Sequence, residues 1–183
     1  MATVNPAGLA AVRSNPGECC RWLAQSGVVS HFQIELLAQT SGITLFHITF
    51  VAPDILAEYP VEEVRVSVLL DGSIAAVPIG GPDRPWYHRY PRWSVAEITN
   101  HNNGPLPWLS IVGGLCLWYP NDPRRWRWTW DDGFDTYLLL VQRHLWAEQY
   151  RRRHGDWPAE DAPHGERLDG TPHPLNNSSR ECA

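Results

Sequence analysis

The chain has 183 residues, which suits one domain with a tail and is too short for two comfortable domains. Its hydrophobic fraction of 43 % and its ten Trp indicate a folded globule, while a net charge of -5 gives no electrostatic reason to expect a nucleic-acid or anionic-membrane partner. No run of ~18 apolar residues and no basic-then-apolar leader is present, so we expect a cytoplasmic protein without a membrane partner.

All fifteen basic residues are Arg, and the chain contains no Lys. A phosphate-binding loop needs a Lys on the β- and γ-phosphates, and a Schiff-base enzyme needs an amine nucleophile, so both classes are excluded. A GxGxxG nucleotide motif is also absent from the sequence. We therefore expect no cofactor.

The four cysteines are too few and too irregularly spaced for a disulfide framework. They are Cys19, Cys20, Cys116 and Cys182. Without a CxxC pair they do not suggest structural zinc, and we expect no metal site. Cys19 and Cys20 fall in a predicted helix, where at least one of them is expected to pack as a small hydrophobic residue.

Two short helices are predicted at the start of the chain. Asn5-Pro6 and Asn15-Pro16 each read as an N-cap followed by Pro at the first helical position. The second helix is predicted over about residues 16–26 and ends at Gly27. Cys20, Trp22 and Leu23 are the residues expected to face the core.

Alternation of apolar and polar residues then predicts strands at residues 31–36, 43–51 and 64–68. Asp71-Gly72 indicates a tight hairpin turn into a strand at residues 74–77. These segments together predict an antiparallel meander of three to four strands with one covered face.

Residues 80–123 show no sustained periodicity, and so long an irregular stretch inside a domain is often functional. After it, Thr129 and Asp132 suggest a capping box, and an apolar stripe at helical spacing predicts a helix that ends near Gly155. The stripe consists of Phe134, Tyr137, Leu138, Val141 and Leu145. Pro, Gly, Asn and Ser dominate after residue 157, which predicts an extended or disordered tail at residues 158–183.

This order of elements, and two local motifs, resemble the ubiquitin-conjugating (UBC) family. Tyr59-Pro60 follows the second predicted strand, and Gly114-Leu115-Cys116-Leu117 is similar to the segment around that family's thioester cysteine. The resemblance implies an α+β fold of UBC type over residues 1–157, with N-terminal helices, the meander, a long active-site segment and a C-terminal helix.

Three further segments resemble bacterial relatives found in anti-phage cyclic-oligonucleotide (CBASS) operons. They are His88-Arg89-Tyr90-Pro91, Leu115 to Pro120, and Trp157-Pro158 with Ala162-Pro163-His164-Gly165. The resemblance implies that Cys116 accepts the C-terminus of a ubiquitin-like protein or of a cGAS-like nucleotidyltransferase as a thioester and transfers it to an amine of a target protein. A separate activating enzyme would supply the ATP-dependent step, because this chain has no nucleotide motif.

His88, with Tyr90 beside it, matches the position of the family's His-Pro-Asn element and is the candidate for supporting Cys116. The Asn of that element is absent, and 27 residues separate His88 from Cys116. His101, which is closer in sequence, and His164 therefore remain alternatives. The absence of Lys fits the chemistry, because a Lys-reactive thioester would find no amine on its own carrier; a high-GC genome that favours Arg codons would explain it as well.

Other functions are also compatible with the sequence. A UBC-like binding module without catalysis would share the fold, and a cysteine hydrolase would use Cys116 with one of the eight His. The Trp-rich and Arg-rich residues 118–130 could stack on single-stranded nucleic acid or sugar, but their place directly after the cysteine favours core packing.

Overall fold

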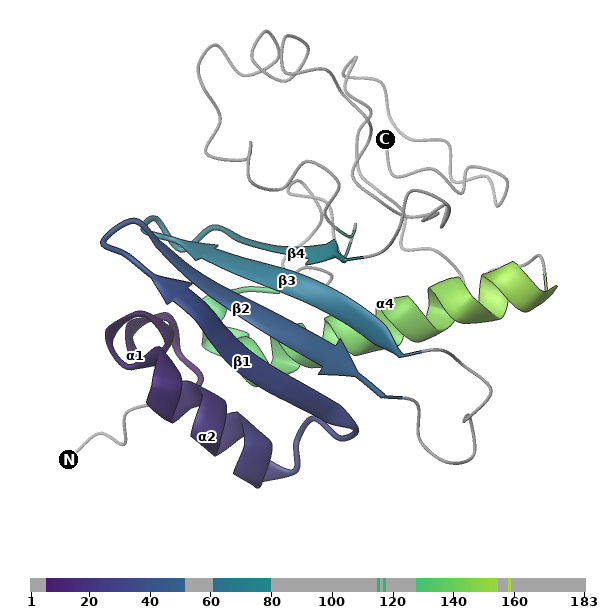
Figure 1. Cartoon of the computed structure of the whole chain (residues 1–183), viewed down its shortest axis with the longest axis horizontal. Helices are drawn as coiled ribbons and strands as arrows, with labels where there is room; N and C mark the ends of the chain where they lie inside the picture. Colours follow the sequence, from purple (N-terminus) through teal and green to yellow (C-terminus); the bar gives the residue numbers. More distant parts are fainter. Residues whose placement is uncertain are drawn as a thin grey trace, which may run out of the picture.

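The computed structural model describes residues 6–51, 61–79, 115, 117, 128–154 and 158 (Figure 1). The described elements, in chain order, are helices α1 (Leu9–Ser14) and α2 (Pro16–Ser26), strands β1 (Phe32–Gln39), β2 (Ile43–Phe50), β3 (Glu62–Leu69) and β4 (Ile74–Pro78), the 3-10 helix η4 (Trp130–Asp132) and helix α4 (Phe134–His154). Both predicted N-terminal helices and all four predicted strands are present, but α1 begins at Leu9 after Gly8 and not at Pro6 as predicted.

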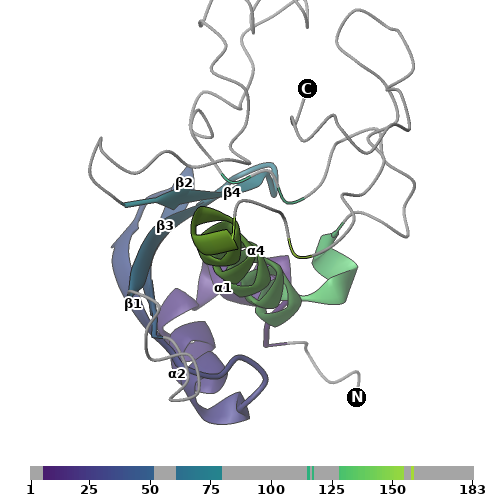
Figure 2. The same ribbon diagram turned by 90° about the vertical axis from the view of Figure 1, so that its right-hand side faces the viewer.

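The strands form one antiparallel sheet in the order β1-β2-β3-β4. Figure 2 shows the sheet curving around α4, with α1 and α2 on the same side as α4. This arrangement is an α+β fold in which helices cover one face of the sheet. It confirms the antiparallel meander expected from the sequence.

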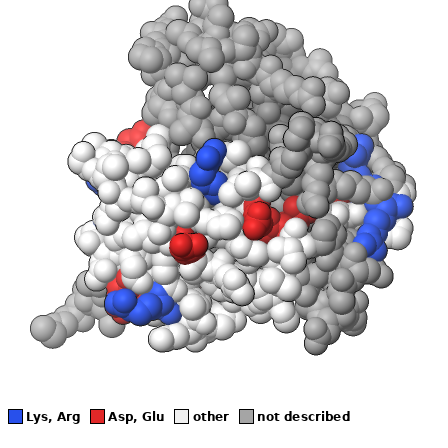
Figure 3. All heavy atoms as spheres, in the orientation of Figure 1, with Lys and Arg blue, Asp and Glu red and all other residues white. Residues whose placement is uncertain are grey.

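The covered face of the sheet supplies much of the core. Alternate side chains of the two central strands are buried: Phe46, Ile48 and Phe50 on β2, and Val64, Val66 and Val68 on β3. The side chains between them, such as His47 and Arg65, belong to the opposite face. On the face seen in Figure 3, acidic and basic residues both lie among uncharged ones, with basic and acidic atoms side by side at the lower left and basic groups at the right edge.

Strand β1 extends further than the alternation predicted. Its pairing with β2 shifts register between Leu36 and Ala38, so a β-bulge lets the strand continue to Gln39. Leu37, at the bulge, is 48 % exposed. The extra residue breaks the two-residue period on which the sequence prediction relied.

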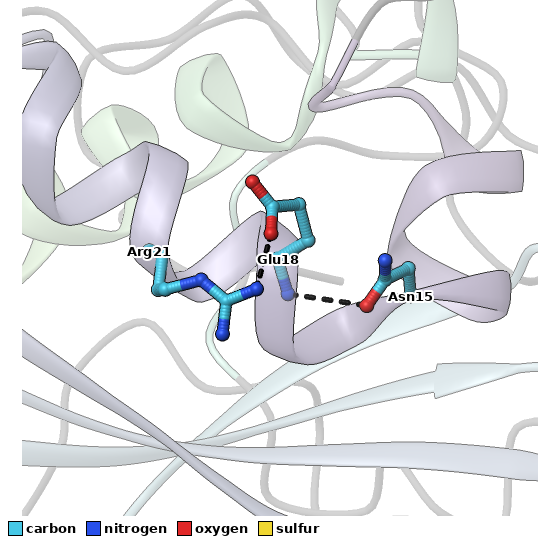
Figure 4. A network of polar contacts seen from close by, with 3 residues as sticks. All are labelled: Asn15, Glu18 and Arg21. Atoms are coloured by element: carbon cyan, nitrogen blue, oxygen red, sulfur yellow. Dashed lines mark hydrogen bonds and ion pairs between the residues drawn. The ribbon is translucent and has the colours of Figure 1, made fainter.

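Helix α2 begins and ends at the predicted residues. The side-chain oxygen of Asn15 accepts a hydrogen bond from the backbone N–H of Glu18 (Figure 4). Pro16 occupies the first helical position. Gly27 ends the helix in the left-handed conformation, with φ of 67°. The helix packs on β1 and buries Leu23 completely.

The predicted capping box is present but serves η4. The Asp132 carboxylate accepts the backbone N–H and the hydroxyl of Thr129. Gly133, at φ 86° and ψ 156°, then separates η4 from α4. All five residues of the predicted apolar stripe on α4 are at most 1 % exposed, so this helix is the central element of the core.

Candidate functional site

The residues on both sides of Cys116 are held against the core. The backbone N–H of Leu115 donates to the carbonyl oxygen of Ala76 on β4 at 2.8 Å, and the Leu115 side chain is 4 % exposed within the main hydrophobic cluster. Leu117 is partly buried and packs against the same cluster. The chain is therefore anchored at the edge of the sheet immediately before and after Cys116.

Strand β4 owes its position to the β3–β4 hairpin. The Asp71 carboxylate accepts the Ser73 N–H at 2.8 Å, and Gly72, at φ 86°, supplies the left-handed residue that the tight turn requires. The indole N–H of Trp130 donates to the Gly72 carbonyl oxygen at 2.7 Å. The hairpin beside Leu115 is thus tied to the chain that follows Cys116.

An aromatic cluster lies between this hairpin and α4. Trp128 packs edge-on against Trp130 and against Tyr137, with ring centroids 4.8 and 5.2 Å apart. The Trp128 indole donates to the Gly133 carbonyl oxygen at 2.8 Å, and the residue is 7 % exposed. The prediction of core packing is confirmed for Trp128, whose ring is not free to stack on a nucleic-acid base.

The two cysteines on α2 are poor nucleophiles. Cys19 is 1 % exposed, and burial, with smaller contributions from Cys20 and Asp135, raises the pKa of its thiol to about 12. Burial also raises the pKa of the Cys20 thiol. Because the thiolate is the reactive form, neither residue suits covalent catalysis, and Cys19 packs as the small hydrophobic residue that was predicted. Both lie beside β1, at the sheet edge opposite β4.

The residues predicted for the site itself are Cys116, His88 and Tyr90, with His101 and His164 as alternatives. All five lie outside the described residues, as do Tyr59-Pro60 and residues 159–183. The structure thus describes the contacts of Leu115 and Leu117 beside Cys116. The catalytic roles of Cys116, His88 and Tyr90 stay predictions.

Sequence reasoning missed a group of buried polar residues on α4. Glu148 is 0 % exposed, and the His144 Nε2 atom lies 3.6 Å from its Oε1 atom. Gln149 donates to the buried carboxylate of Glu62 at the start of β3, and Gln142 donates to the Ser30 carbonyl oxygen at 2.7 Å. Glu148 continues the helical spacing of the apolar stripe by three residues from Leu145, and that spacing was the available signal for its burial.

No three His, Cys, Asp or Glu side chains within the described ranges come close enough to hold a metal ion. Among the helices that the structure describes, none has the length and apolar character needed to cross a membrane. Comparison of the chain with protein-family models, with curated proteins and with solved structures gives no match.

Proposed function

We propose that the chain is a UBC-like acyl carrier whose Cys116 forms a thioester with the C-terminus of another protein and transfers that protein to an amine. The observation that supports this proposal is the anchoring of Leu115 and Leu117. A nucleophile that must meet two large protein substrates in turn needs a rigid base, because small misplacements of reacting groups cost large factors in rate.

The proposal requires a Cys116 sulfur that two protein substrates can reach in turn. Leu115 and Leu117, the residues on either side of it, both pack against the hydrophobic core. Cys19 does not meet the requirement, because the core encloses its thiol.

The proposed reaction has two steps. The Cys116 thiolate attacks an activated carboxyl group, supplied by a separate ATP-using protein, and the activating group leaves as the thioester forms. An amine of the target then attacks the thioester carbonyl carbon, the C–S bond breaks, and the sulfur departs as a thiolate while the nitrogen loses a proton. His88, with Tyr90, is the proposed hydrogen-bond donor to the tetrahedral oxyanion; His101 and His164 are the alternatives.

The biological setting proposed from the resemblance is bacterial antiviral defence. The transferred protein is then a cGAS-like nucleotidyltransferase or a ubiquitin-like protein. Intact-mass spectrometry of the adduct distinguishes the two, because the mass added to the chain is that of the acyl protein.

The test is co-expression of the chain with the genes that neighbour its own, followed by non-reducing gel electrophoresis. We expect a thiol-sensitive adduct that is lost in Cys116→Ala and retained in the matched variants Cys20→Ala and Cys182→Ala. Identical bands from wild type and Cys116→Ala would contradict the proposal. A complex that persists in Cys116→Ala without any covalent adduct would instead indicate a UBC-like binding module.

A further inference from the structure

The described Arg residues lie on three α-helices and one strand. Arg13 lies on α1, Arg21 on α2, Arg65 on β3, and Arg143 and Arg153 on α4. Arg and Lys differ most where a flat guanidinium binds a carboxylate or phosphate through two nitrogens at once. If local contacts selected Arg, these residues would use that geometry.

The contacts of two of these residues do not require a guanidinium. Arg21 pairs with Glu18 through its Nη2 atom, and both side chains are more than half exposed, at 66 % and 58 % (Figure 4). Arg13 donates through Nη1 to the Leu70 carbonyl oxygen at 2.8 Å in an exposed position. A Lys ammonium, which carries three donors, would make either contact.

The property common to all fifteen positions is the lack of a nucleophilic amine. A guanidinium stays protonated in proteins, whereas a Lys loses its proton readily enough to attack a carbonyl. We propose that the Lys-free composition protects the chain from acylation by the thioester on its own Cys116, so that the acyl group passes only to another protein. This inference rests on the proposed function.

The reaction that the composition would prevent is an ordinary aminolysis. A Lys Nζ atom would attack the thioester carbonyl carbon, an amide bond would form, and the C–S bond would break. The electron pair of that bond would leave on the Cys116 sulfur, and the proton lost by the nitrogen would neutralise the thiolate. No oxidant or further reactant is needed.

The sheet predicts where a new Lys would be most exposed to this reaction. Arg65 pairs with Val77 on β4, the residue next to Ala76, whose carbonyl oxygen holds Leu115. With neighbouring strands ~4.8 Å apart, Arg65 lies about 10 Å from the backbone of Leu115. Arg65 is exposed and belongs to the face of the sheet away from the core. Arg21 is on α2, which packs on β1 at the opposite edge of the sheet, and by the same spacing β1 itself lies about 19 Å from Leu115.

The experiment compares Arg65→Lys with Arg21→Lys, a matched pair in which each variant gains one amine and keeps its charge. The probe is a fluorescent peptide with a C-terminal 2-mercaptoethanesulfonate thioester, which exchanges onto a cysteine thiolate and needs no activating enzyme. Dithiothreitol removes the peptide from Cys but not from Lys, and peptide mapping separates residues 21 and 65 from the terminal amine.

We expect wild type to carry the peptide on Cys116 as a thiol-sensitive adduct. Arg65→Lys should add a thiol-resistant adduct on the new Lys, at least about tenfold above that in Arg21→Lys, because a neighbouring group reacts at high effective concentration. The adduct should be independent of protein concentration and absent when Cys116→Ala is combined with Arg65→Lys.

Two outcomes would overturn the inference while leaving the proposed function intact. If the thioester forms on Cys116 but Arg65→Lys gains no thiol-resistant adduct, the absence of Lys does not serve to prevent self-acylation. Codon composition then explains the absence of Lys. If the adduct forms equally without Cys116, the probe reacts directly with Lys. Failure of wild type to form any thioester on Cys116 would instead count against the proposed function.

Discussion

Truncation of Leu115 tests whether the anchor beside Cys116 has the strength that its burial implies. Leu115→Ala removes an almost fully buried side chain from the main cluster, and such truncations cost about 2–5 kcal/mol through lost hydrophobic transfer and the cavity left behind. For a chain of this size each kcal/mol lowers the melting temperature by about 2–4 °C, so the expected fall is about 4–20 °C. The backbone bond from Leu115 to Ala76 survives the substitution, so the segment is loosened rather than released.

Leu23→Ala is the matched control. Leu23 is fully buried on α2, beside the opposite edge of the sheet, and the same truncation there is expected to lower the melting temperature by a similar amount. At a temperature where both variants remain folded, exchange of the peptide thioester onto Cys116 should be slowed in Leu115→Ala alone. The expected reduction is about 10- to 100-fold, the scale set by a misplacement of about 1 Å.

Two results would refute this reasoning. A melting temperature of Leu115→Ala equal to that of wild type, measured by circular dichroism, would mean that the side chain does not pack in the core. Equal exchange rates in the two destabilised variants would mean that the anchor contributes nothing to Cys116, and the main support for the proposed function would be lost.

Two other predictions concern the stability of the fold. The pKa of Cys19 is raised from 9.0 to about 12, so the folded protein holds a proton that the unfolded chain loses; stability should be full below pH 9 and fall as the pH rises above it, and urea titrations of Cys19→Ala should show a shallower fall. If stability falls with pH as steeply in Cys19→Ala as in wild type, the Cys19 thiol is not the cause of the fall. Gly133→Ala should cost about 1–3 kcal/mol in the same assay, because φ of 86° with ψ of 156° suits only Gly and a Cβ there would collide with the Asp135 carboxylate. Gly42→Ala, where a Cβ meets open space, is the control, and equal stability of the two variants would show that Gly133 is not strained.

The sheet was predictable because its inner face repeats every second residue on β2 and β3. That periodicity also set the register, since a shift by one residue would turn Phe46, Ile48 and Phe50 to the outer face. The prediction differed most at the end of β1, where the bulge near Leu37 interrupts the period, and it also placed β3 at residues 64–68 where the strand spans Glu62–Leu69. A local pattern cannot reveal a bulge that depends on pairing with another strand.

The start of α4 shows the same limit. Thr129 and Asp132 predicted a helix start, but they cap η4, and the long helix begins only after Gly133. The Glu62–Gln149 contact could not be predicted from any local pattern, because its two residues are 87 positions apart in the sequence. Residues 80–114 carry no periodicity, so for the candidate site the prediction depends on short motifs around His88 and Cys116 rather than on any fold-wide signal.

The distinction between an acyl carrier and a cysteine hydrolase depends on what lies beside the sulfur. Both form an acyl group on Cys116, but a hydrolase needs a His within hydrogen-bond reach of the thiol, at about 2.6–3.2 Å. His47 lies on β2, three strand spacings or about 14 Å from Leu115, and its Nε2 atom is 3.8 Å from Glu63. His144 lies beside Glu148 in the core. The distance of His47 from Leu115 and the burial of His144, which is 8 % exposed, make both poor candidates for the base of a Cys-His pair. A hydrolase that used His88, His101 or His164 would share its supporting His with the proposed transfer reaction. The nucleophile that resolves the acyl group, water or amine, is then the property that separates the two functions.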